Sequence, residues 1–389
     1  MKLKGQSTQK NKIKLQTYNE VDAKIMAASQ SDLDPFHKLI FFNPAMKFNR
    51  TASLLIAKSY VNYFGKGVTI DGLCSTGARG IRYSLEADVD ELVFIDANPI
   101  ASGVCKKNLK LNKIDAEIKT IDFNLLGAHI KTPVKIIEVD AFGSAIPFLF
   151  TAINSIENEG LLGITATDYA QLAGARVKPC IRHYDAVPYN CDCGHEIGTR
   201  ILMGKIAKVA ASMDKAIKPI GTFFSRHAGR VMSIVENSAN AADLMLEEKI
   251  GYAYFCNKCK DQGTFAKNKI REFSLCQKCE EKLIIAGPLW IGKTIDEKIV
   301  EKSLEYSKKK DDESYKQAEK MFSTLLSEDT FQPLFYDSHQ LCSWAKLNVP
   351  TFVELERKLN DAGYRFSRTH YSPTGFKTDA HAWEIVEII

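Results

Sequence analysis

Apolar and polar positions alternate in blocks between about residue 68 and residue 170 of the chain. Short apolar runs predict strands at 68–73, 91–98, 117–122, 134–141 and 160–168. Before and between them, apolar residues recur at helical spacing at 51–63, 78–87, 99–112 and 145–158. Pro99 suits the first turn of its helix. This regular succession of strand and helix predicts an α/β fold with a doubly wound parallel sheet.

A different pattern begins near residue 250. A highly charged segment predicts one helix over 294–322, and its mixed signs favour a solvated face. A helix near 350–363 and an apolar–polar strand near the end of the sequence predict an α+β arrangement. We therefore expect two domains, 1–248 and 249–389. We expect the basic, polar residues 1–20 to form a mobile tail.

Composition adds little to the picture beyond exclusions. The chain has 389 residues, of which 45% are hydrophobic and 25% charged, and this balance excludes collagen, mucin and wholesale disorder. Lys and Arg exceed Asp and Glu by 52 − 47 = 5, which permits an anionic partner without requiring one. No apolar run approaches the roughly 18–20 residues of a membrane span, and no apolar region follows the N-terminal lysines. We expect a cytoplasmic protein with no membrane partner.

Polar residues at the ends of the first three predicted strands point to a nucleoside cofactor. The first strand runs into the small-residue loop 71–80, DGLCSTGARG, which lets a ligand approach the backbone closely. The loop matches neither GxGxxG nor a Walker motif, so a dinucleotide and a nucleoside triphosphate fit poorly. Asp96 ends the second strand, where a carboxylate can bind ribose hydroxyls, and Asp122 ends the third, where an adenine amine can bind. Each aspartate alone would serve equally well as a cap, but three features in order predict an S-adenosylmethionine site.

The end of the fourth strand carries the candidate chemistry. Asp140 and Phe142 lie in the segment VDAFGSAIPF. If the acceptor of the methyl group is an exocyclic amine such as that of guanine, it is a poor nucleophile because its lone pair is delocalised into the ring. A carboxylate can accept the hydrogen bonds of this amine and later its proton. An aromatic side chain can hold the base by stacking. The alternative is that Asp140 only caps the following helix.

The ten cysteines include two pairs with metal-ligand spacing. Cys256 and Cys259 form one CxxC pair, and Cys276 and Cys279 form a second after an intervening segment of 16 residues. This spacing predicts a closed, structural zinc site with four cysteine ligands rather than a disulfide framework. Cys191 and Cys193 form a CxC motif beside His195; this motif fits a metal site and a surface turn with incidental cysteines equally well.

Several longer strings together resemble the tRNA (guanine-26-N2)-dimethyltransferase family. They are the FNPxMxxNR segment at 42–50, DGLCSTGARGIR at 71–82, DAFGSAIPF at 140–148, GLLGITATD at 160–168 and RTHxxPTGxKTD at 368–379. The resemblance implies a Rossmann-like class I methyltransferase domain and a C-terminal domain specific to the family, which here would be the α+β domain with the predicted zinc site. It implies that S-adenosylmethionine is bound by the residues Arg50, Arg79, Asp96, Asp122 and Phe123, and that Asp140 is the catalytic carboxylate.

The resemblance also implies N2-methyl- and N2,N2-dimethylguanosine as products and tRNA as the partner, with no obligatory protein partner. Two departures from the family pattern stand out: Ala141 and Ala145 replace the usual prolines, and the CxC motif is unexpected. Proline loss loosens the preset geometry of the loop, which would affect the rate or the balance of mono- to dimethylation.

Two further readings compete with this one. The motif at the fourth strand also serves methyltransferases that act on protein glutamine or DNA adenine, and the replaced prolines are compatible with a zinc-containing RNA-binding protein that has lost catalysis. If tRNA is the substrate, both domains need phosphate contacts, and the target base must leave its stack. The candidate contacts are the lysines of 2–14, those near the CxxC pairs, and Arg226, His227, Arg230, Arg365, Arg368, His370 and Lys377.

Overall fold

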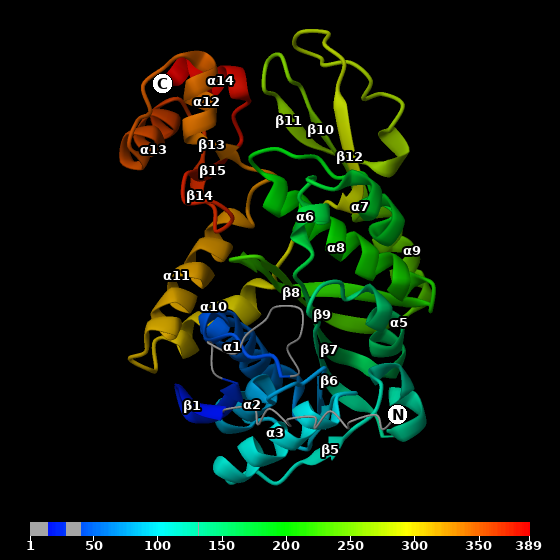
Figure 1. Ribbon diagram of the computed structural model, residues 1–389. Helices are drawn as coiled ribbons and strands as arrows, with labels where there is room; N and C mark the ends of the chain where they lie inside the picture. Colours follow the sequence, from blue (N-terminus) through cyan, green and yellow to red (C-terminus); the bar gives the residue numbers. More distant parts are fainter. Residues whose placement is uncertain (1–14, 29–39, 131) are drawn as a thin grey trace, which may run out of the picture.

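The computed structural model describes residues 15–28, 40–130 and 132–389 (Figure 1). Its helices are α1 Lys47–Phe64, α2 Ala78–Glu86, α3 Pro99–Leu111, α4 Leu126–His129, α5 Ile146–Ser155, α6 Tyr169–Leu172, α7 Val177–Tyr184, α8 Gly194–Ala211, α9 Ala239–Glu248, α10 Glu297–Ser307, α11 Glu313–Glu328, α12 Ser338–Ala345, α13 Phe352–Asp361 and α14 Ala382–Ile388. Its strands are β1 Leu15–Glu20, β2 Ala23–Ala28, β3 Val68–Gly72, β4 Leu92–Ile95, β5 Glu117–Lys119, β6 Val134–Asp140, β7 Ile156–Ala166, β8 Lys215–Ser225, β9 Ala228–Asn237, β10 Ile250–Phe255, β11 Gln262–Ala266, β12 Ile284–Trp290, β13 Tyr336–Asp337, β14 Phe366–Arg368 and β15 Gly375–Thr378.

A seven-stranded sheet with the order β5-β4-β3-β6-β7-β9-β8 forms the centre of the first half. Neighbouring strands from β5 to β7 are parallel, which confirms the predicted doubly wound arrangement. β9 runs antiparallel to β7 and pairs with β8 in a hairpin that completes one edge.

Helices cover both faces of this sheet because successive residues of a strand point to opposite faces. Ile137 and Leu162 pack into one core cluster with α5 and α8. Their neighbours Ile136 and Leu161 pack into another cluster with α1, α10 and α11. The second core therefore combines the large parallel sheet with helices from the C-terminal half of the chain.

The C-terminal half contains two small sheets, with the orders β11-β10-β12 and β13-β15-β14. Figure 1 shows them side by side at one end of the molecule, above the large sheet. The predicted boundary between residues 248 and 249 falls between α9 and β10. Both sides of that boundary share core residues, since Ala253, Leu289 and Phe335 belong to the same cluster as Ile137.

Three local predictions differ from the structure. The predicted helix over 294–322 is two helices, because Asp312 accepts a hydrogen bond from the Ser314 amide (2.9 Å) and starts α11 as its N-cap. Part of the predicted mobile tail is wrong, since β1 pairs with β2 in a hairpin; the lysines of 2–14 lie outside the described residues. The strand predicted near the end of the sequence is present as β14 and β15, but the helix α14, which was not predicted, follows them.

Among the residues that the structure describes, no helix combines the length and the apolar character needed to cross a bilayer.

Candidate active site and cysteine cluster

The loop after β3 folds tightly at the carboxyl edge of the sheet, the edge where the parallel strands end. Gly77 adopts a left-handed conformation (φ 75°), and a Cβ there would lie 2.6 Å from the Cys105 sulfur. The loop amide of Ser75 donates to Asp96 Oδ2 (2.8 Å), and the Asn98 amide donates to Oδ1 (2.9 Å). Asp96 therefore stands half-buried beside the loop with its carboxylate oriented by two backbone amides.

Asp122 and Phe123 follow β5 at the same edge. Asp122 is exposed and caps the short 3-10 helix η3 (Phe123–Leu125) by accepting from the Asn124 amide (2.8 Å). The Phe123 ring is buried, and it packs edge-to-face against Phe148 with ring centroids 6.0 Å apart. A Cβ at Gly72 would lie 2.5 Å from the Phe123 ring, so glycine is required where β3 ends.

Arg50 and Arg79 are both buried near this edge. Arg50, on α1, donates to Glu20 of β1 (Nε to Oε2, 2.9 Å) and to the Asn43 carbonyl (3.0 Å). Arg79, on α2, is 4% exposed and donates through Nη2 to Asp140 (2.5 Å) and Asn49 (3.3 Å). The Nε and Nη1 atoms of Arg79 have no hydrogen-bond partner among the described residues. These two buried guanidinium nitrogens are suited to donate to an anionic ligand.

Asp140 ends β6, with its side chain 37% exposed. Withdrawal from water would by itself raise the pKa of Asp140, but Arg79 outweighs that effect, and together with Arg230 and the Thr165 hydroxyl it holds the pKa at about 2. The carboxylate is therefore ionised throughout the neutral range.

A buried network behind Asp140 includes residues whose role the sequence did not predict. Glu138, in the middle of β6, accepts hydrogen bonds from Tyr83 (2.8 Å) and from Arg230 of β9, and its carboxylate lies 3.9 Å from Arg79 Nε. A Cβ at Gly163 would collide with both Arg230 and Glu138 (2.3 and 2.5 Å). Glu138, an acidic residue set between the apolar Ile137 and Val139, is the sequence signal of this network.

Phe142 is 72% exposed, in the loop that follows Asp140. Its ring lies 5.4 Å from the ring of Phe41, tilted by 49°. Gly143 has φ 98°. Its amide donates to the Thr167 hydroxyl (2.7 Å), and its carbonyl accepts from the Thr167 amide (2.9 Å). The residues that replace the family prolines, Ala141 and Ala145, are buried. The loop thus presents an open aromatic face beside an ionised carboxylate.

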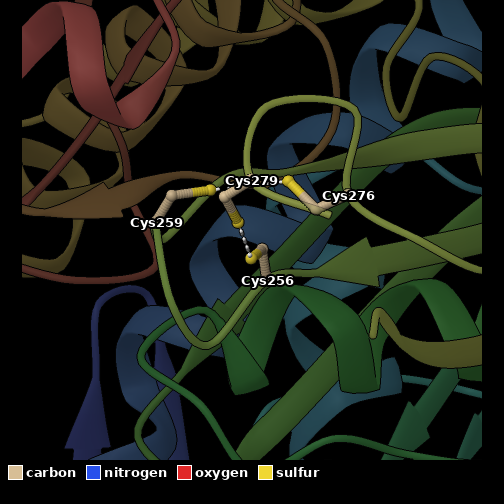
Figure 2. A group of neighbouring side chains, drawn as sticks. All are labelled: Cys256, Cys259, Cys276 and Cys279. Atoms are coloured by element: carbon tan, nitrogen blue, oxygen red, sulfur yellow. Dashed lines mark hydrogen bonds between the residues drawn. The ribbon is translucent and has the colours of Figure 1, made fainter. Parts of the chain in front are cut away.

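The four cysteines predicted to bind zinc come together, as Figure 2 shows. All four sulfurs lie within 4.8 Å of one another, and the pairs Cys256–Cys279 and Cys259–Cys276 are 3.4 and 3.5 Å apart. Zn–S bonds of about 2.3 Å in a tetrahedron place sulfurs about 3.8 Å apart, so the cluster fits a zinc ion.

The two CxxC segments also share one backbone conformation. The amides of Lys260 and Glu280 donate to the carbonyls of the first cysteine in each pair (3.0 and 2.9 Å), and both residues are left-handed, with φ 61° and 57°. Repetition of the same turn directs all four thiols to one point.

Three of the predicted RNA contacts are wrong because their side chains are buried and paired. Arg230 is fully buried against Glu138, and His370 is bonded to Glu328 and to the Phe224 amide. Lys377 is 4% exposed and donates to Glu196 of α8 (2.8 Å). Arg226, His227, Arg365 and Arg368 lie at the surface.

The fold and the edge loops together define a class I S-adenosylmethionine-dependent methyltransferase: parallel strands β5 to β7 completed by the antiparallel strand β9, with a small-residue loop after β3 and a carboxylate after β4. The family model for N2,N2-dimethylguanosine tRNA methyltransferases matches residues 19–389, and the chain belongs to this family.

Individual relatives agree with this assignment. The chain is 36% identical over 357 residues to a tRNA (guanine(26)-N(2))-dimethyltransferase of Pyrococcus abyssi, covering 88% of this chain and 90% of that one. A protein of the same name from Methanothermobacter thermautotrophicus is 33% identical, with 90% and 92% covered. The solved structure of Trm1 from Pyrococcus horikoshii with S-adenosyl-L-methionine superposes with a TM-score of 0.84 at 32% identity, covering 96% of this chain and 100% of that one.

Proposed function

We propose that this enzyme transfers methyl groups from S-adenosylmethionine to the exocyclic N2 of guanine 26 in tRNA, giving N2-methyl- and N2,N2-dimethylguanosine. The observation that carries the proposal is the ionised Asp140 beside the open ring of Phe142, at the edge of the sheet that also presents Asp96. The match to the family over residues 19–389 supports the choice of substrate.

Five residues would hold the cofactor. The unsatisfied nitrogens of Arg79 would bind the carboxylate of the cofactor. Arg50, which donates to the Asn43 carbonyl, would add positive charge there. Asp96 would accept from the ribose hydroxyls, and Asp122 with the Phe123 backbone would bind the adenine. When bound, S-adenosylmethionine supplies a sulfonium-activated methyl group.

Asp140 would act chiefly as a hydrogen-bond acceptor that orients the guanine amine. A carboxylate with a pKa of about 2 is a weak base, so proton abstraction before transfer is unfavourable. Accepting an N–H bond localises the nitrogen lone pair and positions it, and the amine becomes strongly acidic only as it gains the methyl group. Its proton can then leave through Asp140 to water. Phe142 would stack on the extruded base.

We further propose that the cluster of Cys256, Cys259, Cys276 and Cys279 holds one structural zinc ion. Four ligands leave no open coordination position, so the ion would stabilise the fold of residues 256–279 rather than take part in transfer.

One experiment tests the substrate and the atom together. Labelled S-adenosylmethionine is incubated with a tRNA transcript that carries guanosine at position 26, and with a matched transcript that carries inosine there, which lacks only the N2 amine. Label in the first transcript alone supports the proposal. Equal labelling of both, or label only in added protein or DNA, would show that a different amine is the target.

A further inference from the structure

The CxC motif has a geometry that the methyltransferase chemistry does not use. The sulfurs of Cys191 and Cys193 lie 3.3 Å apart, closer than two sulfurs in ordinary van der Waals contact. Cys193 is 1% exposed, whereas Cys191 is only partly buried. One accessible thiol therefore lies against one protected thiol.

The pair is separate from the zinc-type cluster. The only metal-like group of cysteine, histidine and acidic ligands among the described residues consists of Cys256, Cys259, Cys276 and Cys279. Cys193 makes a further contact with the Gln262 side-chain oxygen, at 3.8 Å. With two close sulfurs and no third ligand, the pair is better suited to forming a covalent S–S bond than to closing a metal site.

A cavity gives small molecules access to the pair. It has a volume of about 360 Å3 and is lined by both thiols together with residues of the segment 256–279, of β13 and of α12, among them Gln262, Asp337 and Trp344. Contact with Cys191 and burial raise the pKa of the Cys193 thiol, so this thiol stays protonated near neutral pH and the more accessible Cys191 reacts first.

We propose that Cys191 and Cys193 form a reversible dithiol–disulfide site that reacts with low-molecular-weight disulfides. The Cys191 thiolate attacks one sulfur of the small disulfide, which forms a mixed disulfide and expels one thiolate. The Cys193 thiol then loses its proton to water and attacks the Cys191 sulfur, which closes the intramolecular disulfide and expels the second thiolate. The two cysteines are oxidised by two electrons, and the small disulfide is reduced to two thiols.

Formation of this disulfide would change the contacts of the loop with residues 256–279, the segment that contains the four zinc-type cysteines. A disulfide brings its sulfurs to about 2.05 Å, so the backbone of the loop 189–193 must adjust. That loop contacts the segment through the Tyr189 hydroxyl, which donates to Asn257 (3.0 Å), and through Cys193 and Gln262. Cofactor binding depends on other loops and should be unaffected.

The test uses the zinc-loaded full-length protein and oxidised glutathione in increasing excess over reduced glutathione. After acid quenching and alkylation of free thiols, peptide mass spectrometry reads the state of each cysteine, and elemental analysis reads the zinc content. We expect the 191–193 disulfide in at least half of the molecules while zinc stays bound. We expect Cys191→Ser to abolish the disulfide, and Cys193→Ser to stop at a glutathione adduct on Cys191.

Two results would overturn the proposal. One is full alkylation of both thiols at every glutathione ratio, with wild-type folding confirmed by circular dichroism. The other is oxidation of Cys256, Cys259, Cys276 or Cys279 with zinc release before any 191–193 disulfide appears. Neither result bears on methyl transfer, which the labelled-tRNA experiment tests separately.

Discussion

At the scale of single residues, the charge state of Asp140 is decided by its neighbours. Burial opposes its ionisation, but Arg79, Arg230 and the Thr165 hydroxyl together lower its pKa to about 2. Arg230 is in turn held by Glu138 in the core of the sheet. The reactivity of one carboxylate thus depends on several elements packed around the end of β6.

Removal of the Asp140 carboxylate should strongly slow methyl transfer but leave cofactor binding intact. Asp140→Asn keeps the size and one hydrogen-bond acceptor but loses the charge, so we expect transfer to fall by about 10²–10⁴-fold. Calorimetry should show S-adenosylmethionine affinity within a few-fold of wild type. Wild-type turnover by Asp140→Asn would contradict the proposed role.

The dependence of the methyl-transfer rate on pH should also report the ionisation of Asp140. Because the folded pKa of Asp140 is depressed, the charged form and its contribution to stability persist above the free value of 3.8 and are lost only as pH falls towards 2. Single-turnover rates should therefore show no acidic limb from Asp140 between about pH 5 and 8. Thr165→Val removes a hydroxyl that helps to lower the pKa of Asp140 and should raise that pKa, whereas the matched Thr165→Ser should not. Carboxyl-carbon NMR titration below pH 5 reads the pKa, and equal values in the two variants would argue against this control of Asp140.

At the scale of elements, an ion pair joins the C-terminal sheet to the catalytic half. Lys377 of β15 donates to Glu196 of α8 at 2.8 Å, and Arg200 also bonds Glu196 at 2.9 Å. Burial would raise the pKa of Glu196, but Lys377 and Arg200 outweigh it and hold the pKa at about 2. This contribution to stability is complete above pH 4.5 and is lost as pH falls towards 2.

Breaking this ion pair should lower stability rather than tRNA affinity. Lys377→Met leaves a buried carboxylate with one partner fewer, which we expect to cost about 3 kcal/mol in the free energy of unfolding. Denaturant unfolding measures the loss, and the matched Lys377→Arg, which keeps a positive charge beside Glu196, should lose less. A drop in tRNA affinity and salt slope without a change in stability would instead favour direct RNA contact by Lys377.

The zinc-type cluster should behave as a structural element. Purified protein should carry about one equivalent of zinc, and Cys259→Ser should lose it together with thermal stability and tRNA binding, while S-adenosylmethionine binding persists. Cys191→Ser, which changes a similarly exposed cysteine outside the cluster, is the control and should retain zinc. Fully folded wild-type protein without metal would refute the site.

At the scale of the whole molecule, strand register places one exposed basic turn at the catalytic edge. Thr165 pairs with both Asp140 and Arg230, and Ala166 pairs with Gly229. The β8–β9 turn that contains Arg226 and His227 therefore projects beyond the same edge as Asp140. This makes it a candidate contact for the tRNA backbone.

Neutralising that turn should weaken tRNA binding in a salt-dependent way. Arg226→Gln should lower affinity and reduce the slope of log affinity against log salt by about one unit, because one phosphate contact is lost. Lys66, which precedes the amino end of β3 at the opposite edge, offers the control Lys66→Gln, with no expected change. Equal slopes for Arg226→Gln and wild type would exclude the contact.

The sequence by itself determined the alternation of strand and helix, the positions of Asp96, Asp122 and Asp140 at strand ends, and the spacing of the four cysteines. These features follow from local periodicity and from short-range spacing, which need no knowledge of packing. The tertiary structure alone decided which charges are solvated and which are paired. Arg230 and Lys377 look like surface cations in the sequence, yet each meets a carboxylate far away along the chain inside the core. Only the packing of distant elements brings such partners together, and a charge can be buried only where that partner is present.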